Sequence, residues 1–215
     1  LALSPPLAAP FAAYLLLLTS FHMGEYLLTA AYRPDTLSFD NFLLNHSALY
    51  QIMTVLSWLE YWLEATLPTP LAPLKRWSLV SWLGLATCFV GLCSRFLAMA
   101  TATSNFSHMI EEEKREQHVL VTRGIYGWLR HPAYFGYFYW AVGTQVLLAN
   151  PVCLVAYALA SLFFFIRRIH YEERILLRFF GDDYRRYRDH TRIGIPFIEW
   201  CLQPATSDSH EHNCL

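Results

Sequence analysis

The run 123–137 holds the residues of this sequence that are best suited to chemistry, because Arg130 and His131 stand directly before Pro132. Proline is favoured at the first position of a helix, so a helix is predicted to begin here. A helix start offers free backbone N–H groups and positive potential, which bind a carboxylate or a phosphate. The alternative, which composition alone favours, is that Arg130 and His131 are interfacial anchors and the nearby tyrosines belong to an aromatic belt.

A second candidate lies in the run 167–174, where Arg168 and Glu172 are four residues apart. This spacing places both side chains on one face of a helix. The pair is either an ordinary exposed ion pair, which contributes little to stability, or a functional pair held where a helix leaves the bilayer. The sequence does not separate these two interpretations.

Other ionisable residues carry weaker signals. Arg95 either extends its side chain to the membrane surface, which we favour because it is near the end of its apolar segment, or pairs inward with a carboxylate. Glu60 and Glu64 either line a polar cavity or, as we expect, approach the far interface. The His-Glu-His run at 210–212 is metal-like, but we expect no metal site there.

The composition indicates that lipid is the solvent. Hydrophobic residues make up 55% of the 215 residues and charged residues 15%, against about 25% charged in a typical soluble domain. The formal net charge of −1 predicts no class of partner, and we expect no nucleic-acid binding.

Three apolar segments, at about 7–31, 48–67 and 77–102, are long enough to cross a bilayer. A fourth apolar block, 133–166, is interrupted by Asn150-Pro151 and suits a helical hairpin. We therefore predict an all-α, polytopic integral membrane protein with three full transmembrane helices and a helical hairpin.

The hairpin brings the chain back to the side from which it came, so 103–132 and 167–215 are predicted to share one compartment. These stretches hold twelve of the sixteen Lys and Arg residues, which indicates the cytosol by the positive-inside rule. The predicted divisions are transmembrane helices in 1–102, a catalytic region in 103–198 and a disordered tail in 199–215. Within the catalytic region we expect a cytosolic loop at 103–132, the hairpin at 133–166 and an amphipathic C-terminal helix at 167–190.

Several stretches of the sequence closely resemble the isoprenylcysteine carboxyl methyltransferase family between about residues 20 and 198. The matching stretches are 21–27 (FHMGEYL), 42–47 (FLLNHS), 104–108 (SNFSH), 118–122 (HVLVT), 130–134 (RHPAY), 143–146 (GTQV), 172–173 (EE) and 179–184 (FFGDDY). Relatives in that family have more hydrophobic segments before the first one here, so we expect this chain to be truncated or naturally shorter.

The resemblance implies an S-adenosylmethionine cofactor, and it implies roles for particular residues. Arg168 falls on the position associated with the substrate carboxylate. The residues implied as cofactor contacts are Glu111, His118, Val119, Leu120, Val121, Tyr126, His131, Pro132, Ala133, Tyr134 and Glu172. Glu111 stands where relatives carry glutamine.

The reaction implied is methylation of the C-terminal carboxylate of a farnesylated or geranylgeranylated cysteine in proteins processed at a CaaX motif. Glu172 would face the ammonium of the cofactor, and His131 with the helix start would face its carboxylate. The expected partners are prenylated proteins such as small GTPases, together with membrane lipid. The expected location is the endoplasmic reticulum membrane, with the active site on the cytosolic side.

Three alternatives remain open at this level. The RHPxY element at 130–134 also resembles phospholipid methyltransferases and the C-terminal part of membrane sterol reductases. A reductase would need a basic cluster for a dinucleotide phosphate, and the loop 108–132 is short for one. A non-catalytic channel or scaffold would place facing polar residues in mid-membrane, whereas here they gather at one interface.

Overall fold

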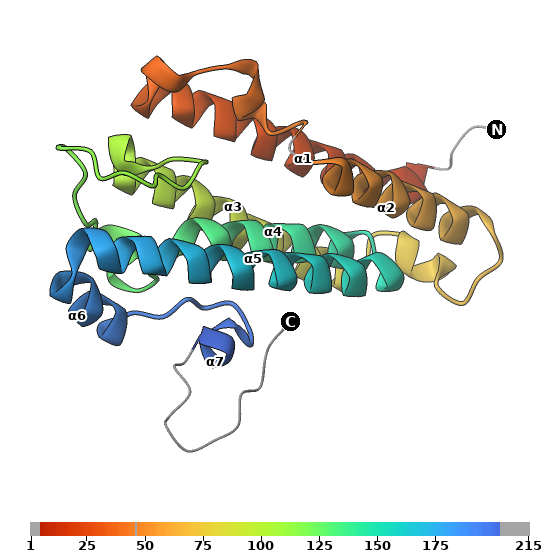
Figure 1. Ribbon diagram of the computed structural model, residues 1–215. Coiled ribbons are helices and arrows are strands. Elements are labelled where there is room, and N and C mark those ends of the chain that lie inside the picture. Colours follow the sequence, from red (N-terminus) through yellow and green to blue (C-terminus); the bar gives the residue numbers. More distant parts are fainter. Residues whose placement is uncertain (1–4, 46, 203–215) are drawn as a thin grey trace.

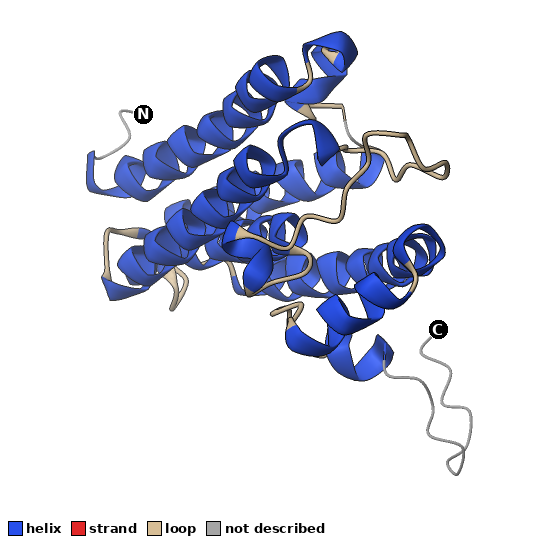
Figure 2. Cartoon of the chain, turned by 90° about the vertical axis from the view of Figure 1, so that its left-hand side faces the viewer, coloured by secondary structure: helices blue, strands red, loops and turns tan. Residues whose placement is uncertain are grey.

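The computed structural model describes residues 5–45 and 47–202, and within them every regular element is a helix (Figures 1 and 2). The α-helices are α1 (Pro5–Tyr32), α2 (Ala48–Thr66), α3 (Leu79–Ala102), α4 (Pro132–Leu147), α5 (Pro151–Phe180), α6 (Asp182–His190) and α7 (Ile198–Leu202). Short 3-10 turns lie at 34–36, 39–42, 72–75, 103–105 and 124–127. The predicted all-helical architecture is therefore confirmed for these residues.

Three helical stretches are long and apolar enough to cross a membrane: Ala8–Tyr32, Leu79–Asn105 and Pro151–Phe180. Two of them coincide with predicted spans. The third is α5, which joins the second arm of the predicted hairpin to the first part of the amphipathic helix predicted at 167–190. The predicted span at 48–67 forms α2 but is not among the three. The hairpin is thus asymmetric, with 16 residues in α4 and 30 in α5.

Local signals in the sequence fix where these helices begin. The Ser47 hydroxyl accepts a hydrogen bond from the Tyr50 amide at 3.1 Å, and Ser78 forms a capping box with Ser81 at the start of α3. Pro132 and Pro151 occupy the first positions of α4 and α5. Proline costs no hydrogen bond there, because the first amides of a helix have no partner within it.

The C-terminal region differs from its prediction in two places. The expected helix at 167–190 is divided at Gly181, whose φ of +54° is readily adopted only by glycine, so that α5 ends and α6 turns away. The expected tail at 199–215 begins too early, because 199–202 belong to α7 and the buried Ile198 anchors that helix. The His-Glu-His run at 210–212 lies outside the described residues.

Close packing of α3 against α4 depends on small residues. A Cβ atom added to Gly91 would lie 2.4 Å from the Trp140 backbone nitrogen, and one added to Gly136 would lie 2.6 Å from the Arg95 backbone nitrogen. Glycine at these crossings lets two helix backbones approach closely, as is common within membranes. The contact sets Arg95 against the first turn of α4.

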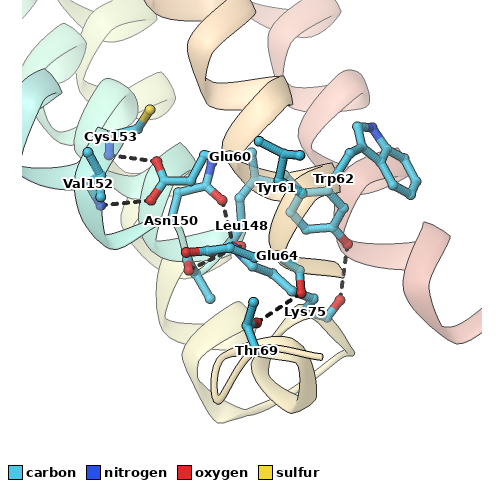
Figure 3. A network of polar contacts seen from close by, with 12 residues as sticks. Glu60, Tyr61, Trp62, Glu64, Thr69, Lys75, Leu148, Asn150, Val152 and Cys153 are labelled. Atoms are coloured by element: carbon cyan, nitrogen blue, oxygen red, sulfur yellow. Dashed lines mark hydrogen bonds and ion pairs between the residues drawn. The ribbon is translucent and has the colours of Figure 1, made fainter. Parts of the chain in front are cut away.

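A polar network closes the far end of the bundle, where α4 turns into α5 (Figure 3). The buried Lys75 Nζ donates to the carbonyl oxygens of Leu148 and Ala149 and to Asn150 Oδ1, and it pairs with Glu64 at 2.6 Å. Glu60 accepts hydrogen bonds from the first free amides of α5. Both glutamates lie at this far end of the bundle, where their side chains contact Lys75 and the start of α5.

At the opposite end of the bundle the chain gathers its remaining polar segments. The end of α1, the end of α3, the loop 106–131, the start of α4 and the end of α5 all lie toward the left of Figure 1, with α6 beside them. The two basic segments predicted to share a compartment therefore meet at one end of the molecule.

Candidate functional site

A cavity of about 900 Å³ occupies this polar end. The predicted site residues that line it are His118, Val119, Leu120, Val121, Tyr126, His131, Pro132, Ala133, Tyr134, Arg168 and Glu172. The structure thus brings together residues from the loop, from the first turn of α4 and from the polar half of α5. Glu111 is the one predicted contact outside the lining.

The start of α4 places a histidine between two carboxylates. His131 is the N-cap residue and is buried, with Nε2 at 3.3 Å from Glu173 Oε1 and Nδ1 at 3.7 Å from Glu172 Oε2. Its ring stacks on that of Tyr134, with centroids 5.5 Å apart. The two ring nitrogens of His131 are therefore each directed toward one of the two glutamates.

Arg168 is held at the cavity wall by two neutral acceptors. Its Nε donates to the Tyr134 hydroxyl at 2.9 Å, and its Nη2 donates to the His108 carbonyl oxygen at 2.6 Å. Among the ion pairs of the described residues none joins Arg168 to Glu172, so the exposed pair considered from the sequence does not form. A guanidinium has five N–H groups, and three of them remain for a ligand.

Arg130, which lines the cavity, forms a buried ion pair with Glu173, which does not. Arg130 Nε donates to Glu173 Oε1 at 2.6 Å, and its Nη1 donates to the Thr191 carbonyl at 2.7 Å. Arg130 is thus neither a surface anchor nor free to bind a ligand with these groups. The only sign of this ion pair in the sequence was the Glu172-Glu173 doublet. The sequence could not show which carboxylate lines the cavity and which pairs with Arg130.

His118 enters the cavity from the loop. Its ring meets the edges of Phe179 and Phe180, with centroids 5.7 and 5.6 Å away. Burial lowers the pKa of His118 below its ordinary value, so the ring is neutral at pH 7. The loop is fixed beyond it by Asn105 Oδ1, which accepts the Val119 amide at 3.0 Å.

Glu111 lies apart, on a smaller cavity of about 370 Å³ between α1 and the loop. Its carboxylate pairs with Arg115 at 2.6 Å and with Arg33 at 3.3 Å. Both oxygens are used by these cations, so Glu111 holds the loop to the end of α1. Of the other predicted site residues, His118 has its Nδ1 atom 3.9 Å from Glu111 Oε2.

Arg95 corrects an expectation from the sequence, because it does not extend to the membrane surface. Its Nε and Nη2 donate to the two oxygens of Glu25 at 2.7 and 2.9 Å, and its Nη1 donates to the Ala133 carbonyl at 3.2 Å. His108 Nε2 lies 2.7 Å from the same carboxylate. Glu25 is fully buried, and an ionisable residue inside an apolar segment was the signal that pointed to such a pair.

Comparison with known proteins shows which family this chain resembles. Residues 82–178 match the model of the isoprenylcysteine carboxyl methyltransferase (ICMT) family. The protein-S-isoprenylcysteine O-methyltransferase of Xenopus laevis is 47% identical over 190 residues, covering 88% of this chain and 65% of the relative. That of Tribolium castaneum is 45% identical over 197 residues, covering 91% and 69%.

A solved structure of a eukaryotic intramembrane Ras methyltransferase, ICMT, matches with a TM-score of 0.87 and 44% identity. The match covers 92% of this chain and 70% of that one. Together with the apolar helices, this likeness defines the class of the protein as a multi-pass, all-helical integral membrane protein, as predicted.

Within that class, the chain belongs to the isoprenylcysteine carboxyl methyltransferase family. It spans about two thirds of the length of the first curated relatives, 65% in one and 69% in another.

Proposed function

We propose that this protein transfers a methyl group from S-adenosylmethionine to the C-terminal carboxylate of a prenylated cysteine, farnesyl or geranylgeranyl, in proteins processed at a CaaX motif. One observation carries this proposal. A single cavity holds the anchored guanidinium of Arg168 beside a cluster of loop and helix residues suited to a charged nucleoside donor.

Two unsatisfied polar atoms support the fit of that donor. Oε2 of Glu172 and Nδ1 of His118 are buried without a hydrogen-bond partner, and both residues line the cavity. Buried polar groups are almost always hydrogen-bonded, so these atoms call for a ligand with polar groups of its own. The Glu172 carboxylate would receive the ammonium of the donor, and His118 to Val121 would form the side next to its nucleoside.

S-adenosylmethionine supplies an activated methyl group on a sulfonium centre. A C-terminal carboxylate is already ionised at neutral pH, so the protein needs no general base. Its task is to place the carboxylate in line with the methyl group and to exclude water.

Arg168 is suited to orient the acceptor carboxylate. Tyr134 and His108 fix the guanidinium plane, and the three remaining N–H groups can bind one or both carboxylate oxygens. Because the Tyr134 hydroxyl and the His108 backbone carbonyl carry no charge, neither neutralises Arg168, whose positive charge is available to the substrate. Arg168 would thus orient the substrate carboxylate, which is the nucleophile, at the cavity wall.

The apolar part of the cavity suits a prenyl chain. Its lining between α1, α2 and α5 includes Phe21, Met53, Tyr157, Ala160 and Phe164. Burial of an isoprenoid against such side chains contributes about 0.8 kcal/mol for each CH₂-sized unit. The lipid would arrive sideways from the bilayer, while the polar donor would come from the aqueous side.

The expected setting follows from the same geometry. The basic segments at the cavity end indicate the cytosolic side by the positive-inside rule, and the prenylated substrates would include small GTPases at the endoplasmic reticulum membrane.

Calorimetric titration of the detergent-solubilised chain with S-adenosylmethionine and, separately, with NADPH tests the proposed donor. Binding of S-adenosylmethionine alone is expected. Binding of NADPH instead would favour reductase chemistry, and binding of neither would favour a non-catalytic scaffold.

A further inference from the structure

The unsatisfied polar atoms of the described residues are unevenly distributed. Five buried side-chain atoms lack a hydrogen-bond partner, and three of their residues line the large cavity: His118, Glu172 and Tyr184. The Glu64 atom outside the cavity faces Lys75 at 2.6 Å. His118 and Glu172 are already assigned to the methyl donor. Tyr184 ends the matching stretch 179–184, but neither the sequence motifs nor the resemblance assigns it a role.

Tyr184 reaches the cavity because α5 and α6 are joined by a tight bend. Gly181, with its φ of +54°, ends α5 and lets the chain turn into α6, and Tyr184 lies in the first turn of α6. The side chain is only 1% exposed, so bulk solvent does not satisfy its hydroxyl. An unpartnered hydroxyl in such a place destabilises the fold unless another group binds it.

The surroundings of Tyr184 indicate which part of the donor it meets. Burial, with the charges of Glu173 and Glu172 nearby, raises its pKa, so the hydroxyl stays protonated and can both donate and accept. Tyr184 and Glu172 line the same cavity, and Glu172 offers the carboxylate that would receive the ammonium. The part of the donor that would meet the Tyr184 hydroxyl is therefore its polar amino-acid end.

We propose that Tyr184 is a further binding residue for the methyl donor, with its hydroxyl hydrogen-bonded to the amino-acid end of that molecule beside Glu172. This inference rests on the proposed function. It accounts for a buried polar atom that no group of the described chain satisfies.

The matched test compares Tyr184, whose hydroxyl has no partner in the cavity, with Tyr139, whose hydroxyl is hydrogen-bonded elsewhere. The Tyr139 hydroxyl donates to the Gly194 carbonyl at 3.2 Å, and Tyr139 is not part of the cavity lining. Tyr184→Phe and Tyr139→Phe each remove one hydroxyl from the full 215-residue chain. Each variant is titrated with S-adenosylmethionine by calorimetry, and its thermal unfolding is followed without ligand.

Tyr184→Phe should raise the Kd for S-adenosylmethionine roughly three- to tenfold, the loss expected for one neutral hydrogen bond. It should leave the unfolding temperature of the ligand-free protein unchanged or higher, because it removes an unsatisfied group. Tyr139→Phe should do the reverse, lowering the unfolding temperature at constant Kd.

An unchanged Kd in Tyr184→Phe, with normal binding by the unsubstituted protein, would overturn the role of Tyr184 alone. A lower ligand-free unfolding temperature in that variant would also overturn it, since the hydroxyl would then already be satisfied, for example by water. Failure of the unsubstituted protein to bind S-adenosylmethionine would overturn the proposed function and this inference together.

Discussion

The two ends of the helical bundle both contain buried charges, but they use them differently. At the far end, Lys75 and Glu60 bind backbone groups at the turn between α4 and α5 (Figure 3). At the cavity end, Arg168 is anchored with N–H groups to spare, and Glu172 keeps an unsatisfied oxygen. Buried charge by itself does not mark a functional site. Donors and acceptors that remain without a hydrogen-bond partner beside a cavity do mark one.

Arg168→Ala should have the largest effect on turnover. Loss of a group that orients the reacting carboxylate is expected to lower the rate about 100-fold or more, with the Kd for S-adenosylmethionine nearly unchanged. Methyl-transfer kinetics and calorimetry measure the two quantities. Arg174→Ala is the matched control, because Arg174 is exposed on the same helix and is not part of the cavity lining. Full activity of Arg168→Ala would remove the role assigned to it.

Lys75→Met should have the largest effect on stability at the far end. It removes the cation that binds Glu64 and the carbonyls of the turn after α4, and breaking such a buried pair costs about 3 kcal/mol. Thermal unfolding should show the loss, while turnover per folded molecule stays the same. Arg76→Met is the control, since Arg76 is exposed. A fall in turnover per folded molecule would contradict the division between the two ends.

Glu172→Gln and Glu173→Gln sharpen the comparison within two adjacent residues. Glu172→Gln should raise the Kd for S-adenosylmethionine about tenfold, because a charge-assisted contact is lost, and should leave ligand-free stability unchanged. Glu173→Gln should instead lower stability, because it weakens the pairing of the buried Arg130. Titration and thermal unfolding of both variants would refute this assignment if the two effects were exchanged.

The smallest expected effect concerns pH. Burial lowers the pKa of His118 from its ordinary value of about 6.5, so the unfolded chain binds the proton more tightly than the folded one. Its contribution to stability is present above that value and is lost as pH falls through the range between the unfolded and folded pKa. Thermal unfolding at about pH 7.5 and about pH 5.5 should therefore show a smaller loss for His118→Gln than for the unsubstituted protein. Equal losses would argue against a neutral, buried ring.

Much of the fold could be predicted from local signals. Apolar length gave the spans, and Pro132 and Pro151 marked where α4 and α5 begin. The break at Gly181 was missed because hydrophobic spacing continues across it, and only the positive φ ends the helix. The span predicted at 48–67 is not among the three apolar stretches for a different reason. The helix α2 has the length of a span but carries Glu60 and Glu64, which belong to the far-end network.

The site was less accessible to sequence reasoning, because its contacts join distant segments. The resemblance indicated Arg168 and Glu172, and the structure places both on one cavity. It could not show that Arg95 turns inward to Glu25, since these residues come from different helices and only their packing brings them together. The separate position of Glu111 has the same origin, in its pairing with Arg33 across the end of α1.

The most direct measurement is transfer of a radiolabelled methyl group from S-adenosylmethionine to a farnesylated cysteine analogue by this chain in detergent. The account predicts label in a base-labile methyl ester, no label with the unprenylated analogue, and loss of label in Arg168→Ala but not in Arg174→Ala. Absence of methyl ester from the unsubstituted protein that binds the donor, or equal labelling of the unprenylated analogue, would contradict it.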